Sequence, residues 1–280
     1  MRHDRHGRTH RLELDDQTLR EWTCTVLGSD PEDGIVLDRS AFYPGGGGQP
    51  PDHGVLIWGG VQTRIVGVRL GDDLWLLPHP DDPLPPVGTS VQGAVDDVRR
   101  SLLMRTHSGL HVLCGVVFRD YGVPVTGGNM EPGQARLDFD LPEVPPGFKE
   151  SLTAALNTEV AADRAVQTSV LPREQAYGMG PIIRTATDLL PPDLEVVRLV
   201  DVVGLDLQAD GGTHVASTRQ IGRIECAEFQ PHHTAGPAGG RLEACLVHAL
   251  GQRRRQRVAA DLDWLATAQT LHRCRTAAVL

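Results

Sequence analysis

The chain has 280 residues, a formal net charge of −9 at pH 7, and 40% hydrophobic but only 4% aromatic residues. A chain of this length can bury a substantial core and is predicted to form two domains. The sequence has no apolar run of membrane-spanning length, and its charged start lacks the apolar core of a secretory signal. The acidic balance argues against a large nucleic-acid footprint, because contacts to phosphates come mainly from Arg and Lys.

The cysteines predict a reducing, cytoplasmic environment. Five are present, and none belongs to a Cys-x-x-Cys pair: Cys24, Cys114, Cys226, Cys245 and Cys274. Such spacing is typical of free thiols rather than of a disulfide framework. Lys149 is the one lysine among 27 basic residues, and this excess of arginine indicates a GC-rich bacterial genome.

The first third of the chain alternates short apolar runs with turns rich in Gly, Pro and Asp. Strands are predicted at residues 20–27, 34–37, 54–57, 63–70 and 73–77. Together they predict a small β-barrel-like domain over residues 1–95. Five prolines between residues 78 and 88 predict an interdomain linker.

The rest of the chain mixes helices and strands. Helices are predicted over residues 96–120, opened by Asp96 or Asp97, and over about residues 146–165. Further strands are predicted at residues 136–140, 168–171, 194–203, 220–229 and 242–249, before a helix at residues 252–275. The pattern predicts an α+β fold. Residues 96–250 would form an antiparallel sheet packed with helices, and residues 251–280 a C-terminal helical tail used for packing or for an oligomer contact.

Two short motifs, His107-Ser-Gly-Leu-His111 and Asp210-Gly-Gly-Thr-His214, predict a metal site. Residues at i and i+4 on a helix share one face, so His107 and His111 can reach one ion. The Gly-Gly pair of the second motif permits a tight turn after a strand. Three imidazoles and a carboxylate suit zinc, which accepts nitrogen and oxygen donors and keeps a position for water in catalytic sites.

A third motif, Ser40-Ala-Phe-Tyr-Pro-Gly-Gly-Gly-Gly-Gln-Pro-Pro-Asp-His-Gly54, contains four consecutive glycines. Without Cβ atoms, such a loop lets a ligand approach the main-chain N–H groups closely. The spacing matches neither a phosphate-binding loop nor a dinucleotide fingerprint.

These motifs resemble those of the editing domain of alanyl-tRNA synthetase and its free-standing relatives, the AlaX alanyl-tRNA editing proteins. The glycine-rich motif resembles the family's Thr-x-Phe-Tyr-Pro-Glu-Gly-Gly-Gly-Gln-Pro-x-Asp-x-Gly, and residues 105–111 its Arg-x-His-x-x-x-His. Residues 136–139 resemble its Arg-x-Asp-Phe, and residues 210–222 its Cys-Gly-Gly-Thr-His-Val with a later Thr and Ile-Gly. The resemblance covers roughly residues 10–250, in the family's order.

The chain departs from the family pattern at three positions. Asp210 replaces the cysteine ligand, and aspartate is a harder, less electron-donating ligand than thiolate. A retuned site, a different ion and an empty site all stay open. Ser40 replaces a threonine that contacts the amino-acid side chain, which would widen the pocket, and Gly45 replaces a glutamate.

The resemblance implies roles for individual residues. The metal ligands would be His107, His111, His214 and Asp210, the last also a candidate base for the attacking water, and Gln49 would orient the ester or the terminal ribose. Substrate-binding residues would be Ser40, Phe42, Gly46, Gly47, Gly48 and Thr213. A local basic patch for the tRNA acceptor end would come from Arg99, Arg100, Arg105, Arg219 and Arg223.

Three functions remain open. The first is zinc-dependent hydrolysis, in trans, of the aminoacyl ester on mischarged alanine tRNA carrying Ser or Gly. The second is an aminoacyltransferase of secondary metabolism that moves the aminoacyl group from tRNA to a small-molecule amine. The third is a non-catalytic module that binds aminoacyl-tRNA. In each case we expect a cytoplasmic monomer or homodimer that makes no membrane contact.

Overall fold

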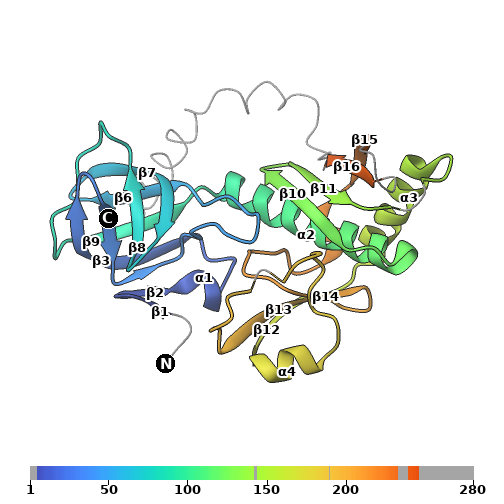
Figure 1. Ribbon diagram of the computed structural model, residues 1–280. Helices are drawn as coiled ribbons and strands as arrows, with labels where there is room; N and C mark the ends of the chain where they lie inside the picture. Colours follow the sequence, from blue (N-terminus) through green and yellow to red (C-terminus); the bar gives the residue numbers. More distant parts are fainter. Residues whose placement is uncertain (1–4, 142–143, 189, 233–238, 246–280) are drawn as a thin grey trace. The chain divides into compact units, whose positions relative to one another are not determined.

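The computed structural model describes residues 5–141, 144–188, 190–232 and 239–245 (Figure 1). Within these ranges it confirms an α+β fold, with an N-terminal antiparallel barrel followed by helices and small antiparallel sheets. Residues Met1–Val247 form one compact unit. The predicted helical tail, residues 251–280, lies outside the described residues. None of the helices described is long and apolar enough to cross a membrane.

The N-terminal part is a closed six-stranded barrel with the strand order β3-β4-β8-β7-β6-β9. Its strands are β3 (Glu21–Asp30), β4 (Gly34–Leu37), β6 (Gly54–Trp58), β7 (Val61–Leu70), β8 (Leu74–Pro78) and β9 (Ser90–Val95). Apolar residues at alternate positions of these strands point into the barrel core, as the period of two requires. The strands predicted over residues 20–77 are therefore confirmed.

The proline-rich segment is not an interdomain linker. Residues 79–89 connect β8 to β9, two strands of the same barrel, and β9 was not predicted from the sequence. Asp82 on this connection accepts hydrogen bonds from the Arg64 backbone and guanidinium, which fixes the loop against β7. The prolines mark a long loop within the barrel, because a proline-rich run indicates irregular backbone but not what it connects.

Three short elements precede the barrel and a fourth lies between β4 and β6. They are β1 (Arg5–His6), β2 (Thr9–Arg11), α1 (Leu12–Asp15) and β5 (Arg39–Ser40). β2 pairs with both β1 and β5 in a three-stranded sheet. This small sheet places residues 12–20 and the glycine-rich motif next to each other in the fold.

The predicted first helix is confirmed as α2 (Asp97–Tyr121), which runs from the end of β9 alongside β10 and β11 in Figure 1. The Asp96 side chain caps it by accepting a hydrogen bond from Arg99 N, and Gly122 ends it in the left-handed conformation. Residues 111–117 are buried all round the helix. The two histidines therefore lie on a helix whose position is fixed by packing.

The remaining elements form two antiparallel sheets with helices. One sheet has the order β10 (Val125–Glu131), β11 (Gln134–Phe139), β16 (Gly239–Cys245) and β15 (Glu225–His232). The other contains β12 (Val166–Pro172), β13 (Val196–Val202) and β14 (Asp206–Ala209). The helices are α3 (Phe148–Ala161), α4 (Arg173–Gly178) and the 3-10 helix η1 (Thr218–Ile221).

Most predicted elements in this half are present, with shifted ends. The strand predicted at residues 220–229 begins only at Glu225, because Ser217 caps η1 and starts a helical turn where a strand was expected. β10, β14 and α4 were missed. The prediction of a strand at residues 242–249 is confirmed as far as Cys245, beyond which the chain is not described.

Candidate metal centre

Three histidines and one aspartate meet at one point of the structure. His107 and His111 come from α2, while Asp210 and His214 come from the loop between β14 and η1, and a ligand atom of each lies within 4.8 Å of the others. The Asp210 carboxylate lies 3.3 Å from His107 Nε2, 3.9 Å from His111 Nε2 and 3.1 Å from His214 Nε2. Neighbouring ligands of a tetrahedral zinc ion lie about 3.4 Å apart, so the spacing fits such an ion.

The loop that carries Asp210 and His214 is held by its own backbone and by Arg198 of β13. Asp210 Oδ1 accepts a hydrogen bond from Gly212 N at 2.6 Å, which closes the turn. Arg198 O accepts from Asp210 N at 3.1 Å, and Arg198 Nη1 donates to Asp210 O at 2.9 Å. β13 therefore fixes the position of the aspartate from behind.

Burial sets the charge state of this cluster. It lowers the pKa of His111 well below its ordinary value of 6.5 and that of His214 to about 4, and the neighbouring histidines act in the same direction. Burial alone would raise the pKa of Asp210, but the neighbouring imidazoles of His107 and His214 hold it well below its usual range. At neutral pH, His111 and His214 are neutral and Asp210 is ionised, the forms that bind a metal ion.

Hydrogen bonds behind two of the three histidines, His107 and His214, direct their Nε2 atoms to the centre of the cluster, whereas the buried Nδ1 of His111 has no partner among the described residues. His107 Nδ1 lies 2.9 Å from Gln49 Oε1, and His214 Nδ1 lies 3.2 Å from Ser108 Oγ. An amide oxygen only accepts, so His107 Nδ1 carries the proton and its Nε2 presents a lone pair. That lone pair faces the Asp210 carboxylate, and a cation, either a proton or a metal ion, is needed between them.

The glycine-rich loop lies over the aspartate of this cluster. Gly45, Gly46, Gly47 and Gly48 have φ values of 86°, 117°, 57° and 83°, a left-handed run that other residues rarely adopt. A Cβ atom on Gly47 would lie 3.1 Å from Asp210 Oδ2. Because Gly46, Gly47 and Gly48 are also exposed, the loop forms an open wall beside the candidate ligands.

The structure shows the surroundings of each predicted substrate-binding residue. Phe42 is a barrel-core residue: it is fully buried and its ring lies 5.1 Å from that of Trp22, so its prediction as a substrate contact is wrong. Ser40 is also buried, and its hydroxyl accepts a hydrogen bond from Phe42 N. Thr213 is buried with its hydroxyl accepting from Gln49 Nε2 at 2.9 Å. A role in substrate binding stays a prediction for Ser40, Thr213 and the three exposed glycines.

The prediction that Arg100 contacts tRNA is wrong. Its side chain is completely buried, it forms an ion pair with the equally buried Asp52, and it donates to Ala41 O and Gln17 O. Asp52 also accepts from Tyr43 N at 2.7 Å. The pair therefore joins α2 to the glycine-rich motif. Both charges are needed for this contact, because each is buried and is neutralised by the other.

The other four predicted arginines reach the surface to different degrees. Arg99 and Arg105 are half-buried and donate to Pro51 O and Ile221 O. Arg219 and Arg223 are exposed, and Arg219 forms an ion pair with Asp163 at 3.1 Å. These four remain candidates for contacts to phosphate.

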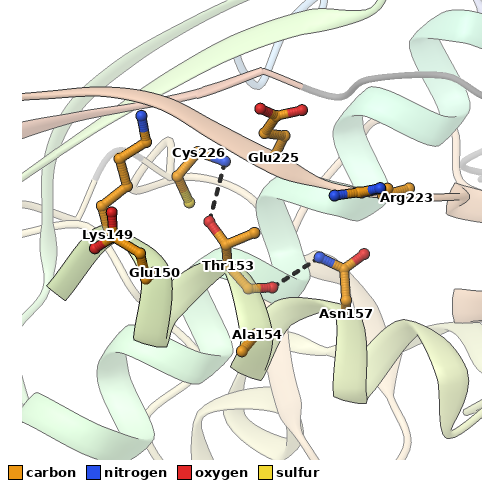
Figure 2. Close-up of a pocket in the computed structure, with 8 residues that line it drawn as sticks. All are labelled: Lys149, Glu150, Thr153, Ala154, Asn157, Arg223, Glu225 and Cys226. Carbon is orange, nitrogen blue, oxygen red and sulfur yellow. Dashed lines mark hydrogen bonds between the residues drawn. The ribbon is translucent and has the colours of Figure 1, made fainter. Parts of the chain in front are cut away.

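A groove of about 580 Å³ lies at a different place, between α3 and the start of β15 (Figure 2). Its lining residues are Lys149, Glu150, Thr153, Ala154, Asn157, Arg223, Glu225 and Cys226. Figure 2 shows Thr153 accepting from Cys226 N and its carbonyl accepting from Asn157. The first bond holds β15 to α3 and the second lies within α3, and the groove contains none of the candidate metal ligands.

Three polar residues that contact the loop at residues 210–214 were not predicted from the sequence. Gln17 Oε1 accepts from His214 N at 2.7 Å, Arg198 contacts Asp210, and Ser108 contacts His214. Gln17 is far away in the sequence and belongs to no motif. Ser108 lies between the two histidines of the first motif, and this position was the one feature of the sequence that could have pointed to any of the three residues.

Comparison with known proteins identifies relatives of this chain. Residues 197–230 match the family described as the threonyl and alanyl tRNA synthetase second additional domain. The chain is 33% identical to the alanyl-tRNA editing protein AlaX-M of Saccharolobus solfataricus over 221 residues, which are 77% of this chain and 91% of the relative. It is 34% identical to the alanine–tRNA ligases of Thermofilum pendens and Pyrococcus furiosus over 79% and 78% of its length, but it spans only 24% of each ligase.

Proposed function

This chain belongs to the family of AlaX-type alanyl-tRNA editing proteins, and we propose that it hydrolyses the aminoacyl ester of mischarged alanine tRNA, carrying Ser or Gly, in trans. The observation that supports this proposal most strongly is the buried cluster of His107, His111, Asp210 and His214 beside the glycine-rich loop. The chain covers nearly the whole of a free-standing editing protein but only a quarter of the ligases. The proposal therefore concerns removal of the amino acid and not its attachment.

We propose zinc as the metal ion. Three imidazole nitrogens and one carboxylate oxygen are donors that zinc accepts, and their spacing agrees with tetrahedral ligands. If the three histidines hold the zinc ion and Asp210 acts as the base, the fourth position would stay open for water or for the ester carbonyl, and the ion would lower the pKa of that water or polarise that carbonyl. With Asp210 also bound, the site would have to expand to five ligands to do the same. Asp210 is a harder donor than the cysteine of the family pattern, which weakens selectivity for zinc over other divalent ions.

The residues around the cluster would position the substrate. The exposed backbone of Gly46, Gly47 and Gly48 would approach the ester or the terminal ribose, because no side chain covers it. Ser40 is fully buried and its hydroxyl accepts a bond from Phe42 N; if the pocket opens to admit an amino-acid side chain, the hydroxyl would still have its own proton to donate to a polar group there. Such a contact favours serine over alanine, since a hydrogen-bonding site penalises the side chain that lacks the partner.

The tRNA contact would be small and local. The net charge of −9 does not favour a broad interface with phosphates. Arg99 and Arg105 on α2, with the exposed Arg219 and Arg223 after the second motif, would suffice for the acceptor end. The three described cysteines are free and buried, in keeping with the prediction of a cytoplasmic protein.

The test is incubation with a panel of radiolabelled aminoacyl-tRNAs, with and without a chelator. We expect rapid, chelator-sensitive release of Ser or Gly from alanine tRNA, and loss of both activity and metal content in His107→Ala and His214→Ala. Esters that stay intact across the panel would contradict hydrolysis. Release that needs an added small-molecule amine would instead indicate an aminoacyltransferase, and binding without turnover would indicate a non-catalytic module.

The role of Asp210 has its own test. If its carboxylate is a ligand, Asp210→Cys retains zinc or binds it more tightly, because thiolate is the stronger donor. Asp210→Ala should lose metal content, as measured by atomic absorption after gel filtration. Full metal content in Asp210→Ala would place the carboxylate outside the ligand set.

A further inference from the structure

We propose that Gln17 and Gln49 are positioning residues of the metal centre, through which the N-terminal part of the chain holds the loop at residues 210–214 and sets the tautomer of His107. The inference rests on the metal site of the proposed function. Gln17 lies between α1 and β3, and Gln49 lies in the glycine-rich motif. Neither residue is among the four candidate ligands.

Gln49 contacts both ligand-bearing segments at once. Its Oε1 accepts from Thr213 N at 3.0 Å and lies 2.9 Å from His107 Nδ1, while its Nε2 donates to Thr213 Oγ1 at 2.9 Å. A backbone N–H can only donate, so the atom that faces Thr213 N must be the amide oxygen. The orientation of the amide is thus fixed, and with it the proton on His107 Nδ1. Both ends of the Gln49 amide are used within the protein.

Gln17 holds the next residue of the same loop. Its Oε1 accepts from His214 N at 2.7 Å and from Arg198 Nη2 at 3.3 Å. Its backbone oxygen accepts from Arg100 Nη1 at 2.9 Å, so the buried pair of Arg100 and Asp52 fixes Gln17 in turn. The amide oxygen again faces a backbone donor, which settles its orientation.

The two glutamines therefore accept the backbone N–H groups of two consecutive loop residues, Thr213 and His214. This loop has no regular secondary structure between β14 and η1, and it carries two of the four candidate ligands. Its conformation depends on acceptors supplied by residues more than 160 positions away in the sequence. Groups that hydrogen-bond to metal-binding histidines typically change metal affinity by roughly 10- to 100-fold when they are removed.

The test compares variants that differ only in the acceptor. Gln49→Met and Gln17→Met keep the approximate length of the side chain but lack the oxygen, whereas Gln49→Glu and Gln17→Glu keep an acceptor. We expect the Met variants to bind zinc roughly 10- to 100-fold more weakly, measured by competition with a chromophoric chelator. The Glu variants should recover most of this affinity. Gln92→Met, on barrel strand β9, is the matched control and should bind zinc as the unchanged protein does.

Two further readouts separate positioning from folding and from the proposed function. Urea unfolding should show that the Met variants remain folded. In 15N spectra of the imidazoles, His107 should remain in the tautomer with the proton on Nδ1 in the unchanged protein and in Gln17→Met. In Gln49→Met it should become a mixture of tautomers. Unchanged zinc affinity and an unchanged tautomer in Gln49→Met would overturn the inference. If the unchanged protein bound no metal, the proposed function would fail, while the tautomer of metal-free His107 would still test the role of Gln49.

Discussion

Gly212 lies so close to His107 that one added methyl group should disturb the metal site. A Cβ atom at Gly212 would lie 2.3 Å from both Cε1 and Nδ1 of His107 and 2.9 Å from Gln49 Oε1. Ordinary contacts between heavy atoms begin at about 3.5 Å, so the ring or the loop must move by about 1 Å. Neither Gly212 nor its neighbour Gly211 has a left-handed φ, so backbone strain does not complicate the substitution.

A displacement of this size allows the loss of zinc affinity to be estimated. We expect Gly212→Ala to weaken zinc binding by roughly 10- to 100-fold, or about 1.4 to 2.7 kcal/mol, as for loss of a group that orients a ligand. Gly211→Ala is the matched control, because a Cβ atom there meets nothing within 4 Å. The assay is competition for zinc against a chromophoric chelator at fixed pH. Equal zinc affinity in Gly212→Ala and Gly211→Ala would refute the predicted clash with His107.

Three further predictions concern stability, pH and tRNA. Asp52→Asn should lower the free energy of unfolding by about 3 to 5 kcal/mol, because it leaves the fully buried Arg100 charge unpaired; a loss below about 1 kcal/mol in urea unfolding would contradict this. The folded pKa of His214, about 4, lies below its ordinary 6.5, so the unfolded chain takes up the proton first as the pH falls. The free energy of unfolding of the metal-free protein should therefore fall between about pH 6.5 and 4, by about 2 kcal/mol at pH 5, and His111 should add to the loss. A free energy of unfolding that stays constant in this pH range would contradict the burial of the two neutral histidines. Arg223→Ala should weaken tRNA binding and reduce its dependence on salt by about one charge, measured by filter binding, and an unchanged slope would remove Arg223 from the interface.

The fold was largely predictable wherever local pattern decides it. Alternating apolar residues located the barrel strands up to β8, and Asp96 with the apolar run after it located α2. The prediction was wrong where the same local sequence is compatible with two different structures. Prolines after residue 78 mark irregular backbone whether it joins two domains or two strands, and Ser217 begins a helical turn inside an apparent strand.

The candidate ligands were predictable from the sequence because each pair lies within five consecutive residues. Helical geometry alone brings His107 and His111 to one face, and a Gly-Gly turn alone brings Asp210 toward His214. The expectation that the two pairs form one cluster rested on two things. Three imidazoles and one carboxylate are a suitable set of zinc ligands, and the motifs resemble those of a known family. The structure brings them within 4.8 Å of one another through the contact of α2 with the loop after β14.

Residues that act through long-range contacts could not be assigned from the sequence. Arg100 and Arg99 are adjacent and chemically identical, yet Arg100 is buried against Asp52 while Arg99 is half-buried. Phe42 belongs to a motif but packs in the barrel core, whereas Gln17 belongs to no motif and holds His214. Sequence determines which side chains are available and how neighbours along the chain share a face. Only the tertiary structure determines which buried donor meets which acceptor, because those partners are brought together by the packing of the whole fold.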